Sequence, residues 1–401
     1  MIPFRVRSAF ALAALLAAAA PGGSARAGEE AGATTAAAEK PAAKDAFHDP
    51  EDKKLDASEW LLDRKGFLPV PILITEPAVG YGGGVGLVFF RGSLREKETE
   101  AQSSGKRFTP PGIFGVAAAG TENGTAFGGT GARLSFKDDQ WRYQGGVAYT
   151  DANLTFYGIG GELGTGENKI GFNLDGWLSS QQILRRLGNS NNHLAFRWVW
   201  LDLQNEFDED HIEPALTGQE RAARDSGIGL SWEYDSRDSI FTATRGVKGA
   251  VESLFYDPSW GGENTFQVYR AQVFGYVPAG KHVILGGRLD GRTARGDVPF
   301  YQLPYVDLRG IPALRYQDEN VAMAEAEVRW LITPRWSAVG FAGLGRAWGR
   351  LDGFDEASDR DTQGVGFRYL LARRLRLASG VDYAVGPDDH AVYLQVGSAW
   401  R

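Results

Sequence analysis

The chain has 401 residues, a formal net charge of −7 at neutral pH and no cysteine, which excludes disulfides and thiol chemistry. Its acidic balance, together with the lack of a prominent basic block, argues against a nucleic-acid partner. The length would allow two or three soluble domains, but large β-barrels of this size also fold as single domains.

The N-terminus has the features of a secretory signal peptide. Two basic residues, Arg5 and Arg7, precede an apolar run, and Ala25 and Ala27 form an Ala-x-Ala cleavage site before Gly28. The alternative is a membrane anchor, but the run is shorter than the roughly 20 residues that span a bilayer. No later apolar run reaches about 18 residues, so any membrane span is expected to consist of strands.

The next segment, 28–66, is rich in Ala, Glu, Lys and Pro and is expected to be a periplasmic linker. Its last part predicts one short helix, with Asp56 or Ser58 as the cap and Gly66 as the stop. So short a segment cannot form a stable cysteine-free domain. The expected division of the chain is a signal peptide at 1–27, a linker at 28–66 and a barrel at 67–401.

From residue 79 onward, apolar and polar residues alternate with a period of two. In the segment 320–332, Ala, Val, Trp and Ile alternate with Met, Glu and Arg. An apolar outer face and a charged inner face are typical of a membrane barrel. A soluble sandwich also alternates, but it buries its apolar face. We predict strands at 79–92, 112–122, 124–137, 141–151, 153–160, 169–186, 192–206, 222–236, 246–258, 263–278, 282–296, 321–333, 335–349, 361–372, 374–385 and 389–400.

The connections between these strands alternate in length. Long odd-numbered connections include 93–111, 208–222, 297–319 and 351–360, and short even-numbered ones include TENGT, DAN, PAGK, TPR and RR. Long loops outside the cell and short turns in the periplasm are the rule for outer-membrane barrels. The predicted fold is therefore all-β, a transmembrane antiparallel β-barrel of about 16 strands.

The connection 297–319 becomes the sixth external loop in this scheme. It carries several apolar side chains, which include Phe300, Tyr301 and Leu303. Such side chains would be sheltered from water if the loop folded back into the lumen. That position would bring Arg309 close to Glu327, which faces inward on the next predicted strand.

Six short segments resemble motifs of one family. They are ITEPAVGYGGGVGL (74–87), YDSRDSIFTATRG (234–246), LRGI (308–311), EVRWLITPRW (327–336), FAGLGRAW (341–348) and YLQVGSAWR (393–401). In this order and on these strands, they resemble the BamA/TamA superfamily of outer-membrane barrels, also called the bacterial surface antigen family. The resemblance covers about residues 67–401. Gly343 stands where the family usually has Asp, Ala243 where it has Pro, and the periplasmic POTRA domains of the family are missing.

The resemblance implies three groups of site residues. The first is a lumen loop motif with its anchoring partner, at Leu308, Arg309, Gly310, Ile311 and Glu327. The second is a periplasmic turn motif at Asp235, Arg237, Asp238 and Gly246. The third is a seam and assembly signal at Gly82, Gly84, Gln395, Gly397 and Trp400. Glycines weaken strands, so those near the seam would either permit a lateral gate or simply relieve crowding inside the barrel.

Catalysis, metal binding and cofactors are not expected. The five histidines are scattered without metal-ligand spacing, and no Ser/His/Asp set suggests a hydrolase. The acidic segments 207–211 and 387–390 are interpreted as solvated loop charge rather than divalent-cation sites beside lipopolysaccharide. Aromatic residues on the predicted strands are expected to form a girdle at the lipid interfaces; they are Phe196, Trp198, Trp200, Trp232, Tyr234, Trp330 and Trp400.

The expected function is that of an outer-membrane barrel that assists the assembly or transport of outer-membrane or secreted proteins. Its expected partners are outer-membrane lipids, lipopolysaccharide and unfolded outer-membrane protein clients. A second hypothesis is a solitary barrel that acts as a pore, a lipid-handling element or a structural component. The missing POTRA domains favour the second hypothesis, whereas the loop motif and the terminal signal favour the first.

Overall fold

The computed structural model describes residues 47–63, 66–92, 111–159, 170–207 and 222–400, and four further residues at 95, 96, 99 and 103. The predicted signal peptide and most of the predicted linker lie outside the described residues. One short helix, α2 (Ser58–Leu62), precedes the sheet, and no helix within the described residues is long and apolar enough to cross a membrane.

One antiparallel sheet of 16 strands, each paired with the next in sequence, forms nearly the whole molecule. The strands are β1 (Gly66–Glu76), β2 (Gly80–Arg91), β3 (Gly112–Thr121), β4 (Ala126–Phe136), β5 (Trp141–Phe156), β6 (Ile170–Arg186), β7 (Asn192–Phe207), β8 (Ala222–Asp235), β9 (Gly246–Tyr256), β10 (Phe266–Ala279), β11 (Val283–Gly296), β12 (Asn320–Leu331), β13 (Trp336–Trp348), β14 (Arg360–Ala372), β15 (Leu377–Val385) and β16 (His390–Val396). Two short 3-10 helices, η4 (Pro258–Trp260) and η5 (Phe300–Gln302), lie in connections.

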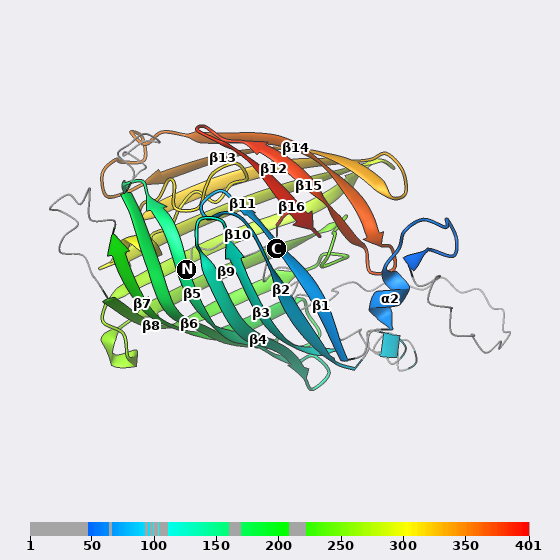
Figure 1. The fold of residues 1–401 in the computed structure, drawn as a ribbon, viewed down its shortest axis with the longest axis horizontal. Coiled ribbons are helices and arrows are strands. Elements are labelled where there is room, and N and C mark those ends of the chain that lie inside the picture. Colours follow the sequence, from blue (N-terminus) through cyan, green and yellow to red (C-terminus); the bar gives the residue numbers. More distant parts are fainter. Residues whose placement is uncertain are drawn as a thin grey trace.

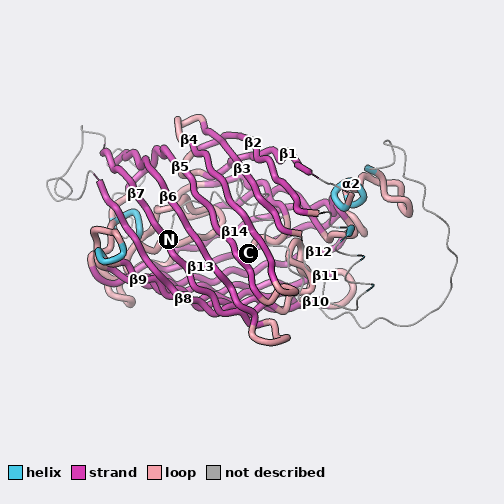
Figure 2. Tube along the Cα trace, turned by 90° about the horizontal axis from the view of Figure 1, so that it is seen from below, coloured by secondary structure: helices cyan, strands magenta, loops and turns pink. Residues whose placement is uncertain are grey.

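The sheet curls into a nearly closed barrel (Figures 1 and 2). Strands β1 and β16 lie next to each other, but they are not paired in the sheet. The predicted all-β antiparallel barrel of about 16 strands is therefore confirmed.

Side chains alternate between an exposed apolar face and a buried polar face. On β12, Val328 and Trp330 are exposed, whereas Glu325, Glu327 and Arg329 are buried. Successive side chains of a strand point to opposite faces, so this pattern places charge inside the barrel and apolar surface outside. That distribution is the reverse of a soluble protein and is the one expected of a barrel in lipid.

Two predictions of strand boundaries were wrong. The predicted first strand, 79–92, is β2, because β1 precedes it and pairs with it from Gly66 to Glu76. The predicted strands 141–151 and 153–160 are the single continuous strand β5. The two errors cancel in the strand count. They reverse the predicted side of the three connections between β2 and β5, because each connection in an antiparallel sheet lies at the end opposite to the previous one.

The β2–β3 connection shows this reversal directly. It was predicted to be external, yet Arg95 pairs with Glu59 and lies 2.5 Å from Asp63, beside α2. The connection therefore lies at the same end of the barrel as α2. From β6 onward, the predicted parity of the connections agrees with the structure.

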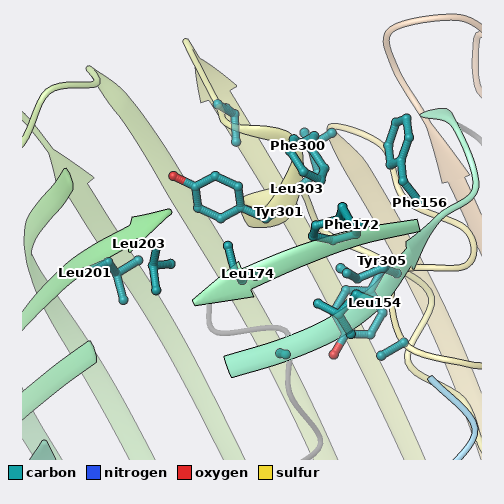
Figure 3. Close-up of a cluster of buried hydrophobic side chains, with 14 of the residues drawn as sticks. Leu154, Phe156, Phe172, Leu174, Leu201, Leu203, Phe300, Tyr301, Leu303 and Tyr305 are labelled. Atoms are coloured by element: carbon teal, nitrogen blue, oxygen red, sulfur yellow. The ribbon is translucent and has the colours of Figure 1, made fainter. Parts of the chain in front are cut away.

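The main apolar core lies between the strands and the β11–β12 connection. Every residue from Val298 to Asp318 in this connection is buried. Phe300 lies 5.2 Å from Phe156 of β5, 5.1 Å from Phe172 of β6 and 5.5 Å from Phe207 of β7, measured between ring centroids (Figure 3). The connection is therefore packed like part of a protein interior rather than like an exposed loop.

Candidate functional site

The predicted LRGI motif, at residues 308–311, lies in a tight turn against the end of β15. Gly310 has a φ of +95°, and a Cβ there would lie 3.0 Å from the backbone of Val385 and Gly386. Only glycine combines that backbone conformation with so close an approach. The Gly310 amide donates a hydrogen bond to the Tyr393 hydroxyl on β16 at 3.0 Å. The turn thus holds the neighbouring Arg309 in a defined position.

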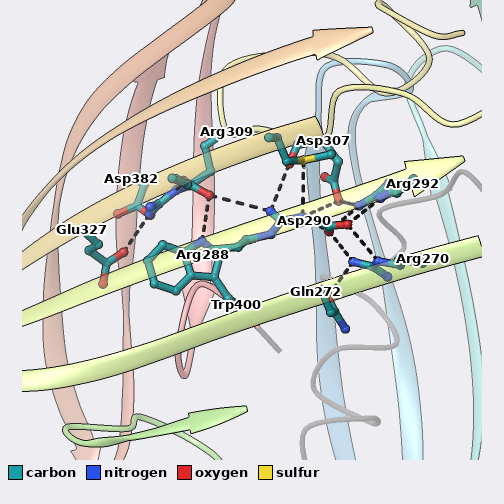
Figure 4. A network of polar contacts seen from close by, with 12 residues as sticks. Arg270, Gln272, Arg288, Asp290, Arg292, Asp307, Arg309, Glu327, Asp382 and Trp400 are labelled. Carbon is teal, nitrogen blue, oxygen red and sulfur yellow. Dashed lines mark hydrogen bonds and ion pairs between the residues drawn. The ribbon is translucent and has the colours of Figure 1, made fainter. Parts of the chain in front are cut away.

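Arg309 is surrounded by three buried carboxylates (Figure 4). Its Nε lies 2.6 Å from Glu325 Oε1, and its Nη1 lies 2.9 Å from Asp382 Oδ2 and 3.1 Å from Glu327 Oε2. The Glu327 contact is an ion pair without hydrogen-bond geometry, because Glu327 Oε2 has no hydrogen-bond partner. Arg309 also stacks on the Phe341 ring at 3.5 Å. Glu327 is thus one of three partners, and Glu325 and Asp382 were missed by sequence reasoning.

Further cations balance the three carboxylates. Arg368 donates to both oxygens of Asp382 at 2.6 and 2.8 Å. Arg288 Nη1 lies 3.8 Å from Glu325 Oε2, and Arg329 Nη2 lies 3.7 Å from Glu327 Oε1. A buried charge is tolerated when it is paired and costs several kcal/mol when it is stranded. The site is therefore a mutually dependent charge network.

A second network attaches the same connection to β11. Asp307, two residues before Arg309, accepts a hydrogen bond from Arg292 at 2.9 Å. The Asp307 carbonyl accepts another from Arg288 at 3.1 Å. Asp290 lies between the two arginines, at 2.7 Å from Arg288 and 3.0 Å from Arg292 (Figure 4). The inward Arg-x-Asp-x-Arg pattern of β11 was the sequence signal that could have pointed to this attachment.

The predicted turn motif closes on itself at the α2 end of the barrel. Arg237 pairs with Asp235 at 2.7 Å, and Asp238 accepts the backbone N–H of Thr244 at 2.9 Å. Gly246 has a φ of +99°, and a Cβ there would lie 2.4 Å from the Ser236 carbonyl oxygen. These residues are brought together in a structural turn. The Ala243 carbonyl of the same turn accepts a hydrogen bond from Arg329 at 3.2 Å, which links the turn to the Arg309 network.

The predicted seam residues divide into two places. Gly82 and Gly84 lie on β2, between β1 and β3, and therefore not on the seam as predicted. A Cβ at these positions would lie 2.3 and 2.1 Å from carbonyl oxygens of β3, so small residues are needed for the strands to approach. Gln395 lies on β16, opposite Gly380 of β15.

The C-terminus leaves the barrel wall after β16. Gly397 has a φ of +82°, and Trp400 beyond it is buried. Trp400 stacks on Tyr276 at 5.6 Å and donates a hydrogen bond to Glu325 Oε2 at 2.7 Å. Its assignment to an aromatic girdle was therefore wrong, because it lies inside and touches the Arg309 network. Phe196, Trp198, Trp232 and Trp330 are exposed.

The segment before β1 is attached to the turns at one end of the barrel. Arg335, in the β12–β13 turn, lies 2.5 Å from Asp49, 2.7 Å from Asp52 and 2.5 Å from Asp56. The hydrogen bond from Arg335 lowers the pKa of Asp52 to about 2. Sequence reasoning missed this contact, although an acidic N-terminal segment and arginine-bearing turns were both visible.

Among the described residues, no group of three or more His, Cys, Asp or Glu side chains is placed to hold a metal ion. In the acidic segment 387–390, Asp388 accepts hydrogen bonds from Arg315 at 3.0 Å and from Tyr316. Asp388 thus binds the buried connection. The other acidic segment, 207–211, lies outside the described residues after Phe207.

Comparisons with known proteins identify a family. The model of the Omp85 superfamily domain matches residues 101–390. None of the curated proteins matches this sequence.

Three solved structures resemble the barrel. BamA from Haemophilus ducreyi lacking POTRA domains 1–3 has a TM-score of 0.56 at 11% identity, over 83% of this chain and 69% of that one. CdiB from Acinetobacter baumannii has a TM-score of 0.54 at 11% identity, over 82% of this chain and 59% of that one. CdiB from Escherichia coli has a TM-score of 0.53 at 13% identity, over 82% of this chain and 62% of that one. At these identities the likeness concerns the fold.

Proposed function

This chain belongs to the Omp85 superfamily, and we propose that it assists the insertion or translocation of outer-membrane or secreted proteins through its β1–β16 seam. The superfamily consists of non-enzymatic outer-membrane barrels that insert or translocate proteins. The observation that carries the specific proposal is that β1 and β16 touch without pairing.

An unpaired seam is the place where a barrel opens most easily. A strand edge carries free N–H and C=O groups that can pair with an incoming strand. Every other pair of neighbouring strands in this sheet is hydrogen-bonded, so lateral opening elsewhere would break a ladder. An unfolded client would add its first strand to one of the two free edges.

We propose that the β11–β12 connection is folded into the lumen and is anchored there. Support comes from the burial of residues 298–318, from the three carboxylates around Arg309 and from the attachment of Asp307 to β11. In this proposal, the LRGI motif and Glu327 hold the barrel in one shape while the seam opens. The connection also limits free passage through the barrel.

The proposed organisation is a signal peptide at 1–27, a periplasmic linker at 28–66 that includes α2, and a barrel at 67–401. The exposed apolar faces of the strands support direct contact with outer-membrane lipids. Lipopolysaccharide and unfolded outer-membrane proteins are the proposed partners on the two sides of the membrane.

The test is an insertion assay in liposomes that carry the purified barrel. The folding rate of a urea-unfolded outer-membrane client is compared with the rate in empty liposomes. We expect the barrel to accelerate folding, and Arg309→Ala to reduce the acceleration. Arg295→Ala removes an exposed arginine and should behave like the unchanged protein. Equal rates with and without the barrel would refute the proposal, and conductance of the barrel would then be measured to test the pore hypothesis.

A further inference from the structure

A cavity of about 450 Å³ lies against the inner faces of β3, β4 and β5. Its wall includes five glycines, which are Gly115, Gly129, Gly131, Gly145 and Gly146. The charged residues that line it are Arg133, Arg197 and Lys248, and all three are cations. No carboxylate lines the cavity among the described residues. This charge distribution contrasts with the balanced networks around Arg309.

The side chains of Arg133 and Lys248 make no hydrogen bond or ion pair with any part of the chain that the structure describes. On neighbouring strands, Arg133 lies opposite Ile113 and Gln144, neither of which carries charge. Lys248 lies opposite Asp235, but Arg237 occupies that carboxylate at 2.7 and 2.9 Å. Carboxylates farther away attract the two cations without contacting them.

Arg197 contributes a third donor group to the same cavity. Its Nη1 pairs with Glu252, and its Nη2 donates to Gln182 Oε1 at 3.2 Å. Its Nε is buried and has no hydrogen-bond partner among the described residues. Gln144 and Ser180 also line the cavity and add neutral hydrogen-bonding groups. The wall thus offers three positive charges and at least one unused buried donor.

Arg133 and Lys248 line one cavity without a contacting carboxylate, so their charges repel each other. The buried Arg197 Nε, a donor without a partner among the described residues, also costs free energy. A compact oxyanion would remove both costs, because guanidinium and ammonium groups form strong charge-assisted hydrogen bonds to phosphate oxygens. We propose that this cavity is a binding site for a phosphate group, held by Arg133, Arg197 and Lys248. The phosphate is either a free anion or part of a phospholipid headgroup.

The test measures the thermal unfolding midpoint of the purified barrel in detergent. The readout is the change in electrophoretic mobility that accompanies unfolding on heating. Sodium phosphate replaces sodium chloride at constant ionic strength and pH. A ligand that binds only the folded state raises the midpoint, so we expect phosphate to raise it by a few degrees. The double variant Arg133→Gln, Lys248→Gln should lose this response. It should also unfold at a higher temperature without phosphate, because the mutual repulsion of the cations is reduced.

The matched control is Lys281→Gln, Arg295→Gln, which removes two exposed cations outside the cavity and should keep the full response. If the double variant does not fold, Lys248→Gln alone provides the same comparison.

Glycerol 3-phosphate serves as a probe for a phospholipid headgroup. A larger rise in the unfolding midpoint than with inorganic phosphate indicates a lipid source, and an equal or smaller rise indicates the free anion. No rise with either probe, or an equal rise in the double variant, would overturn the proposal. The measurement does not depend on insertion activity.

Discussion

Arg309 joins three buried carboxylates at one point. It contacts Glu325, Glu327 and Asp382, which lie on two different strands. Each of these carboxylates also has a second cation, but Arg309 contacts all three. The residue therefore connects the β11–β12 connection to β12 and β15 at once.

We expect Arg309→Ala to lower the stability of the folded barrel by about 3–5 kcal/mol, because three buried carboxylates lose the cation that they share. Glu327→Gln should cost less, since its contact lacks hydrogen-bond geometry and Arg309 keeps two other carboxylates. Heat resistance of the electrophoretic mobility and protease resistance measure both effects. If Arg309→Ala is as resistant to heat and protease as Arg295→Ala, Arg309 does not stabilise the folded barrel.

At the scale of elements, the segment 47–63, which includes α2, contacts strands on both sides of the β1–β16 seam. Ala57 and Leu61 pack in one apolar cluster with Leu68 of β1 and Leu377 of β15. The Ala57 amide also donates to the Leu371 carbonyl at 2.8 Å. The segment therefore links both sides of the β1–β16 seam at the α2 end (Figure 1).

We expect Arg335→Gln to release this segment, because three carboxylates lose their shared partner. A spin label on Lys54→Cys, the only cysteine in an otherwise cysteine-free chain, should then become more mobile. Arg376→Gln, in the neighbouring β14–β15 turn, serves as the control, since Arg376 pairs with Asp238 instead. Equal label mobility in all three proteins would show that Arg335 does not hold the segment.

The same attachment should depend on pH in one direction. The pKa of Asp52 falls from its ordinary 3.8 to about 2 in the folded protein, chiefly through the hydrogen bond from Arg335. A carboxyl with a lowered pKa stabilises the folded state above its unfolded pKa, and this contribution is lost as pH falls through the folded pKa. Label mobility should stay low above about pH 4 and rise toward pH 2. A rise confined to neutral or alkaline pH would contradict this assignment.

At the scale of the whole molecule, the barrel is interrupted between its first and last strands. The sheet runs from β1 to β16 without a break, and the two terminal strands are the only pair of neighbours that the described residues leave unpaired. After Gly397, the chain turns inward and places Trp400 against Glu325. The last strand is consequently short, which leaves part of β1 without a possible partner.

We expect a disulfide between β1 and β16 to abolish client insertion, because the seam can no longer open. The two cysteines are placed where the Cα atoms lie within the roughly 4.4–6.8 Å that a disulfide requires. A control disulfide joins Phe67→Cys and Phe89→Cys, exposed positions that are already paired between β1 and β2. If the barrel with the oxidised seam disulfide still inserts the client at the same rate as after reduction, lateral opening is disproved.

Local patterns in the sequence determined the fold class and the side of most strands that faces lipid, whereas the strand count agreed because two errors cancelled. Alternation with period two is a property of neighbouring residues, so it could be recognised without knowing what each strand pairs with. β1 was missed because its sequence, GFLPVPILITE, is apolar on both faces and contains two prolines, which argue against a central strand. Once it was missed, the seam was assigned to the wrong strand.

Only the tertiary structure decided which charges meet and how the segment after β16 packs. Arg309 and Asp382 are 73 residues apart in sequence, Trp400 and Glu325 are 75 apart, and Arg335 and Asp49 are 286 apart. No local pattern specifies such pairs, because their distance depends on how the whole sheet curls. The sequence by itself therefore determined a membrane barrel. The tertiary structure alone determined the partners of Arg309, the cationic cavity and the unpaired seam.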